Sequence, residues 1–344
     1  MDSITHIALG ACVGEAFFGK GFGKKAMLWG ALAQSAPDID FLGTLWLSTD
    51  ENLLAHRGFT HSILFALLIS PVLAMAAEKI HRPHNIRFSK WLIFFATEVF
   101  LHLLLDGFNN YGVGWFEPFS HHRFSFNAIY VADPFFSIWA GIAIVMLFVL
   151  HSYHRRRRFW WRFGVFIPFL YLGWCTINKI KINSDVKKIL QQQHIPYTRY
   201  FSTPTPFNNL LWYVVAGNDS GYHVGFRSIL DSKRQISFEY FPRNDSLLQS
   251  VADHEEVQHL IRFSQQFYTA EQWGDTLVFN DLRFGQMKGW QDPKGKFVFH
   301  YILNHPEDNT LVVQRGRFAG WNKSVVRSFI RRIRGEGRGE RSER

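Results

Sequence analysis

Four apolar stretches in the first half of the chain constrain its fold more than any other feature. They are Ser62–Ala77, Trp91–Leu105, Pro134–Leu150 and Phe159–Ile177. A helix needs about 20 mainly apolar residues to cross the roughly 30 Å hydrocarbon core of a bilayer. The four stretches approach this length and contain few charges, so we expect about four transmembrane helices.

Two shorter apolar segments precede these stretches. Ile4–Phe18 and Ala26–Ala36 are joined by Gly19–Lys25, and each is too short for an unassisted span. They predict a short N-terminal helical pair, re-entrant or tightly packed, because backbone in lipid must satisfy its own hydrogen bonds. Two core helices of a soluble bundle are the alternative. Since Met1-Asp2-Ser3 lacks a basic start, we do not expect a signal peptide.

The second half of the chain alternates polar and apolar residues, as a soluble domain does. Helices are predicted at Lys179–Gln193 and Asp253–Ala270. Strands are predicted at Leu210–Ala216, His223–Leu230, Ile236–Phe241, Thr276–Asn280, Phe297–Leu303 and Thr310–Gln314, with a hairpin turn at Gly217–Gly221. The predicted fold is therefore a mainly α-helical membrane domain over residues 1–178, a small soluble α+β module over 179–326, and a basic tail over 327–344 that is frayed or a surface helix.

The net charge of +10 gathers in clusters that predict the orientation of the chain. Positive residues beside apolar spans mark cytoplasmic loops, which here are Lys79–Lys90 and Arg155–Arg158. The chain is then a multi-pass protein of a bacterial inner membrane. The opposite ends of the spans and the C-terminal module are extracytoplasmic. The same placement argues against a nucleic-acid partner, which is the other common role of basic clusters.

Ionisable side chains lie at the predicted outer ends of the apolar segments, where burying them is unfavourable. His102 and Asp106 are four residues apart, so they share one face of a helix. Asp38 and Asp40 follow Pro37, and two carboxylates this close repel each other unless a cation bridges them or one is protonated. These two pairs predict a shared cation site.

A histidine pair, His56 and His61, brackets the turn before the first predicted span. Imidazoles and carboxylates together are the ligands of a borderline divalent metal, zinc or manganese, bound as one ion or two. The alternatives are a helix cap for the paired aspartates, an ordinary hydrogen bond between His102 and Asp106, and a pH-sensing or merely polar role for His56. Because all three alternatives would have to hold on the same membrane face, we favour the metal site.

These residues resemble the YdjM-type family of membrane-bound metal-dependent hydrolases. The resemblance covers roughly residues 1–150 and is carried by Thr5-His6, Pro37-Asp38-Ile39-Asp40, the HRGxTHS element His56–Ser62 and His102–Asp106, with Pro118-Phe119 and Asp133-Pro134 as later landmarks. It implies that His6 and Asp133 join the metal ligands. The family is distantly similar to the zinc-dependent phospholipase C and P1 nuclease group, which implies phosphoester hydrolysis by a fold-level analogy.

The function that we expect is a metal-dependent hydrolase of the inner membrane, with its site on the extracytoplasmic face. It would cleave a phosphoester or lipid-linked substrate with metal-activated water. Asp40 or Asp106 would bridge metals or accept a proton, and Arg57 would hold an anionic group in a forked pair. Arg123 is a second candidate for that role. A non-catalytic metal-binding membrane protein, either a transporter or an envelope-stress scaffold, is the alternative.

Overall fold

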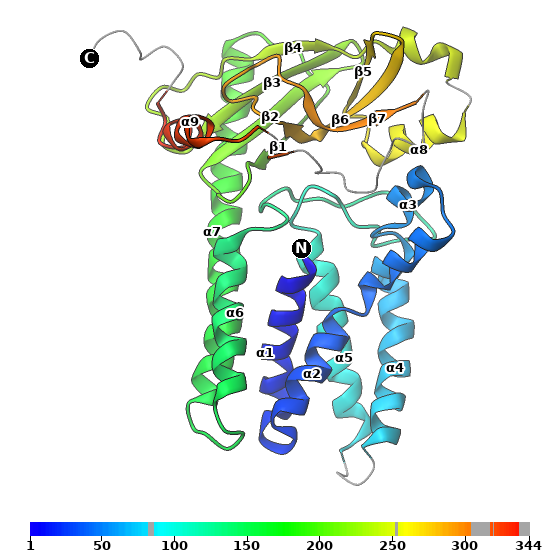
Figure 1. The fold of residues 1–344 in the computed structure, drawn as a ribbon, viewed down its shortest axis with the longest axis vertical. Helices are drawn as coiled ribbons and strands as arrows, with labels where there is room; N and C mark the ends of the chain where they lie inside the picture. The colour runs from blue at the N-terminus through cyan, green and yellow to red at the C-terminus, as the bar shows by residue number, and fades with distance from the viewer. Residues whose placement is uncertain (82–85, 252–253, 304–316, 319, 337–344) are drawn as a thin grey trace. The chain divides into compact units, whose positions relative to one another are not determined.

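The computed structural model describes residues 1–81, 86–251, 254–303, 317–318 and 320–336 (Figure 1). The chain forms two compact units. The first comprises Met1–Leu45 and Ala55–Cys175, and the second comprises Trp46–Leu54 and Thr176–Arg344. One helix, α7, is continuous across the boundary between the two units. The change in hydropathy near residue 178 therefore does not mark the end of a helix.

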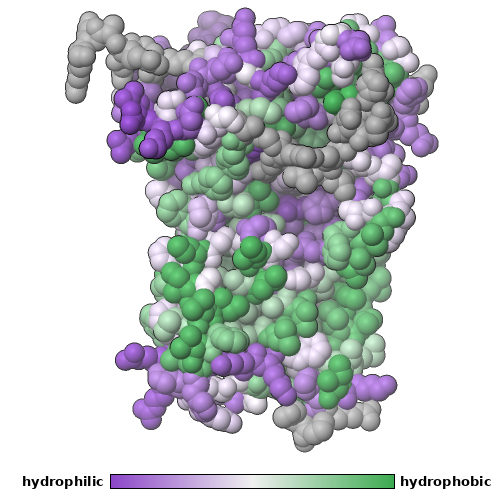
Figure 2. Space-filling view, viewed as in Figure 1, coloured by the Kyte–Doolittle hydropathy of each residue, from purple (hydrophilic) through white to green (hydrophobic). Residues whose placement is uncertain are grey.

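The first unit is built from helices. They are α1 (Ser3–Phe22), α2 (Lys24–Gln34), η1 (Pro37–Leu45), η2 (Phe59–His61), α4 (Ile63–Ile80), α5 (Phe88–Asp106), α6 (Pro134–Val149) and the first part of α7 (Arg157–Gln192). The turn between α1 and α2 and the loop between α6 and α7 lie at the same end of this unit (Figure 1). Figure 2 shows apolar side chains around the middle of these helices and hydrophilic ones at that end.

Three helices of the described residues are long and apolar enough to cross a membrane, namely α4, α5 and α7. The remaining predicted span, Pro134–Leu150, also forms a helix, but α6 has only 16 residues. Its axial rise is about 24 Å, which is less than the roughly 30 Å hydrocarbon core. The predicted span Phe159–Ile177 and the predicted polar helix Lys179–Gln193 are one helix, α7, because no glycine or proline separates them.

The predicted N-terminal pair is confirmed as two closely packed helices. A Cβ atom on Gly10 would clash with the carbonyl oxygen of Gly30, and a Cβ atom on Gly30 would clash with the carbonyl oxygen of Gly10. Only glycine therefore allows the two backbones to approach this closely, as is common where helices pack in membranes. This packing places the end of α2 against α5, where Gln34 meets the last turns of that helix.

The second unit contains two antiparallel sheets. The first has the order β1 (Arg199–Pro204), β2 (Leu211–Asn218), β3 (Gly221–Ser228) and β4 (Glu239–Pro242), and the second has the order β5 (Tyr268–Trp273), β6 (Thr276–Gln286) and β7 (Phe297–Ile302). The predicted turn is confirmed, because Asn218 pairs with Gly221 across the β2–β3 hairpin. The α+β class of the module is as predicted, with two sheets in place of one.

The core of this unit follows the alternation of β2. Trp212, Val214 and Ala216 pack against Ile182 and Ile189 of α7, on one face of the first sheet. The intervening residues of β2 point to the opposite face, since successive strand side chains alternate. There Tyr213 and Val215 pack with Leu282 and Phe297 of the second sheet. The C-terminal part of α7 and the two sheets thus form three layers.

Several predictions in this unit are wrong or incomplete. The strands β1 and β5 were not predicted, and β4 begins three residues later than the predicted Ile236–Phe241. The predicted helix Asp253–Ala270 is α8 (Glu255–Phe263) followed by β5. Gln265 and Gln266 take positive φ angles of 52° and 69°, which end the helix, and nothing in the polarity of the segment signals this. The predicted strand Thr310–Gln314 lies outside the described residues.

Two further helices complete the described part of the second unit. The region predicted as a tail contains most of α9 (Lys323–Ile333), whose Val325 and Phe329 pack against Trp290. Asp50 on α3 (Thr49–Ala55) accepts a 2.6 Å hydrogen bond from His259 Nδ1 on α8. The short 46–54 segment therefore packs with the C-terminal residues, although it lies between two parts of the first unit in the sequence.

Candidate metal centre

Four side chains of the first unit bring metal-ligand atoms together, namely Asp38, His61, His102 and Asp106. One ligand atom from each lies within 4.8 Å of all the others. His61 Nε2 is 3.6 Å from Asp38 Oδ1 and 3.4 Å from Asp106 Oδ2. His102 Nε2 is 3.5 Å and 3.6 Å from the same two oxygens. Two nitrogen and two oxygen donors at this spacing can hold a divalent metal.

Local structure explains this convergence. His102 and Asp106 occupy successive turns at the end of α5, as their spacing predicts. His61 ends η2, and the hydroxyl of Ser62 caps α4 by accepting from Phe65 N at 3.0 Å. The backbone at His61 is thereby fixed where the chain enters α4. Asp38 is carried by η1, which follows α2 directly.

His102 is held in one tautomer. Its Nδ1 lies 2.6 Å from the carbonyl oxygen of Gln34, and that oxygen can only accept, so Nδ1 carries the proton. In the neutral ring Nε2 is then unprotonated and carries a lone pair. It lies 3.1 Å from His61 Nε2, within hydrogen-bond distance, and also faces the two carboxylates. A hydrogen bond from the far nitrogen of an imidazole is the usual support of a metal-binding histidine.

On its far side, His61 Nδ1 forms a 3.0 Å hydrogen bond with Thr60 Oγ1 and lies 3.5 Å from Asp40 Oδ2. Burial lowers the pKa of His61 well below its ordinary value, so its imidazole is neutral at pH 7. Burial alone would raise the pKa of Asp40, but the hydrogen bond and charge of His56 and the hydrogen bond from the Arg57 backbone hold it below its usual value. Asp40 therefore stays ionised beside the cluster, outside the group of four.

Arg57 lies beside this cluster. Its side chain is buried, with 4 % of the residue exposed, and contacts several protein groups. Its Nε is 3.3 Å from Asp106 Oδ2, its NH1 donates to Asn109 Oδ1 at 2.8 Å, and its NH2 donates to the carbonyl of Met1. The backbone of Arg57 has a φ of 58°, a conformation that non-glycine residues rarely adopt. Its N–H donates to Asp40 Oδ2 at 2.8 Å and its carbonyl accepts from Gly114, and these two bonds hold the strained backbone.

The structure places the other predicted residues around the four. The ring of His6 stacks on that of His102 with centroids 3.9 Å apart, and its Nε2 is 3.2 Å from Asp106 Oδ1. The amino group of Met1 also contacts Asp106 Oδ1. His56 is partly exposed, with Nδ1 3.3 Å from Asp40 Oδ2.

Asp133 and Arg123 have partners outside the cluster. Asp133 caps α6, accepting from Phe135 N at 2.8 Å, and its other oxygen accepts from Tyr171 at 3.1 Å. Burial raises the pKa of Asp133 to about 6. Arg123 donates to the carbonyl of His56 at 2.9 Å, so it supports the loop that carries the histidine.

A metal fits this donor set. Within the described residues, the buried atoms here without a hydrogen-bond partner include His6 Nδ1, Asp40 Oδ1 and Asp106 Oδ2. Buried polar atoms in native proteins are rarely left unpaired. A metal ion held by the four converging side chains would give Asp106 Oδ2 the partner it lacks. Only Asp38 of the four reaches solvent, with 25 % of its side chain exposed.

Two supporting residues were not predicted from the sequence, Gln34 and Asn109. Gln34 contributes a backbone carbonyl, which no sequence pattern can reveal. Asn109 follows α5 by three residues, and its position just after His102–Asp106 is the only signal that could have suggested it.

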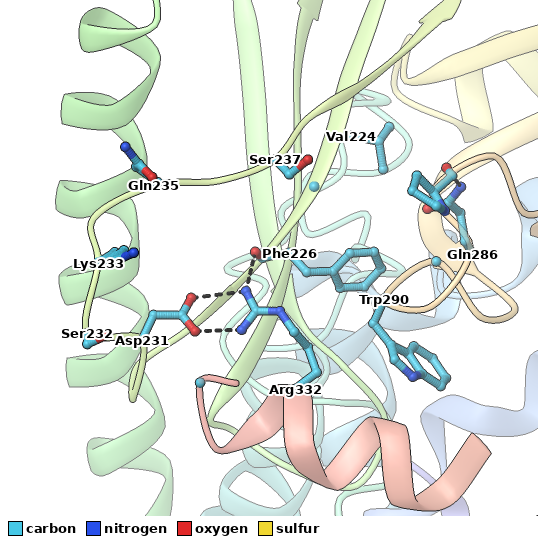
Figure 3. Close-up of a pocket in the computed structure, with 14 residues that line it drawn as sticks. Val224, Phe226, Asp231, Ser232, Lys233, Gln235, Ser237, Gln286, Trp290 and Arg332 are labelled. Carbon is cyan, nitrogen blue, oxygen red and sulfur yellow. Dashed lines mark hydrogen bonds and ion pairs between the residues drawn. The ribbon is translucent and has the colours of Figure 1, made fainter. Parts of the chain in front are cut away.

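A second pocket, of about 270 Å³, lies in the C-terminal unit between β3, the loop after it and α9 (Figure 3). Arg332 from α9 forms a forked ion pair with Asp231, at 2.5 and 3.0 Å, and donates to the carbonyl of Phe226 at 2.8 Å. These charged groups satisfy each other. The pocket therefore lacks the convergence of unpaired donors that marks the first unit.

Two features define the class of this protein. The first unit contains apolar helices of membrane-spanning length, and a buried cluster of possible metal ligands lies at one end of them. The chain is therefore an integral membrane protein with a candidate metal centre. The chain belongs to the YdjM inner membrane protein family, whose sequence model matches residues 1–182. The predicted membership of the YdjM family is thus confirmed, and the match includes every residue of the cluster.

Two relatives extend this result. Inner membrane protein YbcI of Escherichia coli (strain K12) is 32 % identical over 123 residues, which are 35 % of this chain and 69 % of that protein. The uncharacterized protein YfhP of Bacillus subtilis (strain 168) is 32 % identical over 340 residues, covering 93 % of this chain and 95 % of that protein. No solved structure matches the chain.

Proposed function

We propose that this protein is a metal-dependent hydrolase of the bacterial inner membrane that cleaves a phosphoester in a lipid or another membrane-proximal substrate. One observation carries the proposal. Asp38, His61, His102 and Asp106 bring one ligand atom each within 4.8 Å of one another, and the buried Asp106 Oδ2 has no hydrogen-bond partner among the described residues. A carboxylate oxygen buried in this way is unfavourable unless a positive partner compensates it.

Zinc is the metal that we propose, because two imidazoles and two carboxylates suit it, and manganese is the alternative. Asp38, His61, His102 and Asp106 would hold it. A divalent ion supplies positive charge that polarises a phosphoryl oxygen and lowers the pKa of water toward neutrality. Clustered metal sites of the phospholipase C and P1 nuclease kind remain an analogy for this chemistry.

The surrounding residues receive distinct roles. Arg57 positions Asp106, because its Nε lies 3.3 Å from Asp106 Oδ2 while its two terminal nitrogens donate to Asn109 and to the Met1 carbonyl. Asp40 is the proposed proton acceptor, since it is ionised and contacts the partly exposed His56, which can pass a proton to solvent. This differs from the expectation that Arg57 binds the substrate anion directly.

The membrane setting supports an amphiphilic substrate. Asp38 is the accessible ligand, and apolar side chains of the same short helix η1 are exposed beside it, with Phe41 64 % and Leu45 76 % exposed. An acyl chain can lie along such a surface while its headgroup reaches Asp38. The positive-inside rule would place this end of the unit on the extracytoplasmic face, because the basic residues lie at the other end.

The direct test is hydrolysis by the detergent-purified full chain, stripped with chelator and reloaded with Zn²⁺ or Mn²⁺. Phospholipid in mixed micelles and a soluble aryl phosphodiester serve as substrates. We expect metal-dependent cleavage that His102→Ala abolishes and Asp133→Asn retains. Cleavage without added metal, or equal cleavage by His102→Ala, would reject the proposal.

A second candidate, a metal or proton transporter, rests on Glu98. This carboxyl is fully buried in the candidate span α5, one turn before His102, and the Gln34 amide nitrogen donates to its Oε2 at 2.7 Å when that amide is oriented to satisfy both of its ends. Ionisable groups inside membrane spans often mark ion pathways. Metal uptake into proteoliposomes that Glu98→Gln eliminates would favour transport over hydrolysis.

A further inference from the structure

A large basic cleft lies at the end of the first unit opposite the metal cluster. Its volume is about 1150 Å³, and it is lined by the end of α1, the start of α5, the α6–α7 loop and the first turns of α7. These are the segments that Figure 1 shows at the same end of the helices. The proposed hydrolase makes no use of this cleft.

The charges of the cleft are strongly unbalanced. Its lining includes six lysine and arginine residues and one acidic residue, Glu15. Glu15 is already paired with Arg157, whose Nε and NH2 donate to it at 2.7 and 2.6 Å, and both side chains are buried. Five cations then remain in the lining, which are Lys20, Lys90, Arg155, Arg158 and Arg162. None of these five forms an ion pair with any described carboxylate.

The Glu15–Arg157 pair gives the cleft a rigid base. Arg157 also donates to the backbone carbonyls of Leu147 and Leu150, so it ties the end of α6 to α1. The exposed cations are therefore carried by helices whose ends are held together by Arg157. Repulsion among five unpaired positive groups favours an anionic ligand between them.

Aromatic side chains form the remaining walls. Phe17, Phe18, Phe22 and Trp161 line the cleft, and Lys90 lies 4.8 Å above the ring of Phe18. Phosphate oxygens would meet the lysines and arginines while glycerol and the first acyl carbons meet the rings. A soluble inorganic anion would gain nothing from contact with these apolar walls.

We propose that this cleft binds the phosphodiester headgroup of an anionic phospholipid. Basic pockets between helices at a membrane surface bind multiply charged lipid headgroups in this way. The chain spans a membrane beside the cleft and belongs to a family of inner membrane proteins, so lipid is the anion at highest local concentration. The bound lipid would fix the α1–α2 turn against α7.

The test compares lipids and matched variants of the full chain in detergent. The binding of phosphatidylglycerol and of phosphatidylcholine with the same acyl chains is measured by native mass spectrometry and by the shift of the thermal unfolding midpoint. Lys20→Gln with Arg158→Gln removes two exposed charges from the cleft. The control, Lys25→Gln with Lys79→Gln, removes two exposed charges outside it.

We expect phosphatidylglycerol to bind and stabilise the wild type and the control pair, and to bind the cleft pair roughly tenfold or more weakly. A charge-retaining pair, Lys20→Arg with Arg158→Lys, should bind as the wild type does. Equal binding of the two lipids, or equal losses in cleft and control pairs, would overturn the proposal. Equal stabilisation by inorganic phosphate would also overturn it, because the site would then serve a soluble anion.

Discussion

The two units bury charge in opposite ways. In the C-terminal unit Asp281 is fully buried, and both of its oxygens accept hydrogen bonds from Arg283, at 2.6 to 3.2 Å. In the first unit Asp106 is equally buried, yet its Oδ2 makes no hydrogen bond with any described residue. This oxygen lies 3.3 Å from Arg57 Nε and 3.4 to 3.6 Å from His61 and His102, and the other oxygen contacts the Met1 amino group, but none of these is a forked pair.

This difference distinguishes a buried carboxylate that is fully hydrogen-bonded within the protein from a buried carboxylate that is a candidate metal ligand. A buried carboxylate with a forked arginine is complete within the protein. Asp106 meets Arg57 and the Met1 amino group without a forked pair, and its remaining neighbours are histidine nitrogens and Asp38, an arrangement of donor atoms that can hold a metal. The arrangement of neighbours distinguishes the two cases when burial alone does not.

The largest expected effect is the loss of metal from the first unit. His61→Ala and Asp106→Ala each remove one of the four converging ligands. We expect metal affinity to fall by more than the roughly 10- to 100-fold typical for changes to residues that only support ligands. Metal titration of the detergent-purified variants measures this.

Asp133→Asn is the matched control for those ligand variants. Asparagine caps a helix about as well as aspartate, so α6 should persist and the metal content should stay at the wild-type value. Full metal content in both His61→Ala and Asp106→Ala would show that the four residues do not form one site.

The next effect is expected in the C-terminal unit. Asp281→Asn leaves the buried Arg283 without its charged partner, which costs about 3–5 kcal/mol of unfolding free energy. Urea unfolding followed by tryptophan fluorescence measures this loss. Metal content should not change, and a variant that lost its metal while remaining folded would remove the distinction between the two kinds of buried charge.

A smaller effect is expected for Arg57→Lys. Lysine cannot reproduce the separate contacts to Asp106, Asn109 and the Met1 carbonyl. If Arg57 is a positioning residue, its substitution should lower kcat by roughly 10- to 100-fold while KM changes little. Steady-state kinetics on the metal-loaded enzyme separate these constants. A rise in KM with unchanged kcat would instead assign Arg57 to substrate binding.

The smallest effect concerns Asp50 and its bond to His259. Burial would raise the pKa of Asp50, but the hydrogen bonds from His259 and Ser48 outweigh it and lower the folded-state value. Stability from this lowered pKa is present above the unfolded value near 3.9 and is lost as the pH falls through the folded value. Asp50→Asn should therefore lower the unfolding free energy by about 1 kcal/mol at pH 7 and by less at pH 3, which lies below the unfolded value. Denaturant unfolding at both pH values checks this, and an equal effect at both would contradict it.

The sequence predicted the cluster best where local geometry decides the outcome. His102 and Asp106 converge because residues four apart share a helix face. Asp38 and Asp40 were predicted as ligands together, but they lie on the 3-10 helix η1, which has three residues per turn. Residues two apart there point in different directions, so Asp38 joins the four and Asp40 faces His56 and the Arg57 backbone.

Features that depend on distant contacts could not be predicted. The carbonyl of Gln34 reaches His102 only because α2 packs against α5, and the sequence of neither helix contains that information. In the C-terminal unit, β5 follows α8 without a proline or glycine at the boundary, so polarity alone suggested one long helix. The apolar stretches were the more reliable signal, because their length is set by the bilayer.

The central claim is that the buried cluster of the first unit holds a metal. Elemental analysis of the full chain, purified in detergent without chelator, tests it most directly when wild type and His102→Ala are compared. We predict at least one equivalent of zinc or manganese per wild-type chain and a clear loss in His102→Ala. A wild-type chain without metal, or a variant with the same metal content, would contradict the claim.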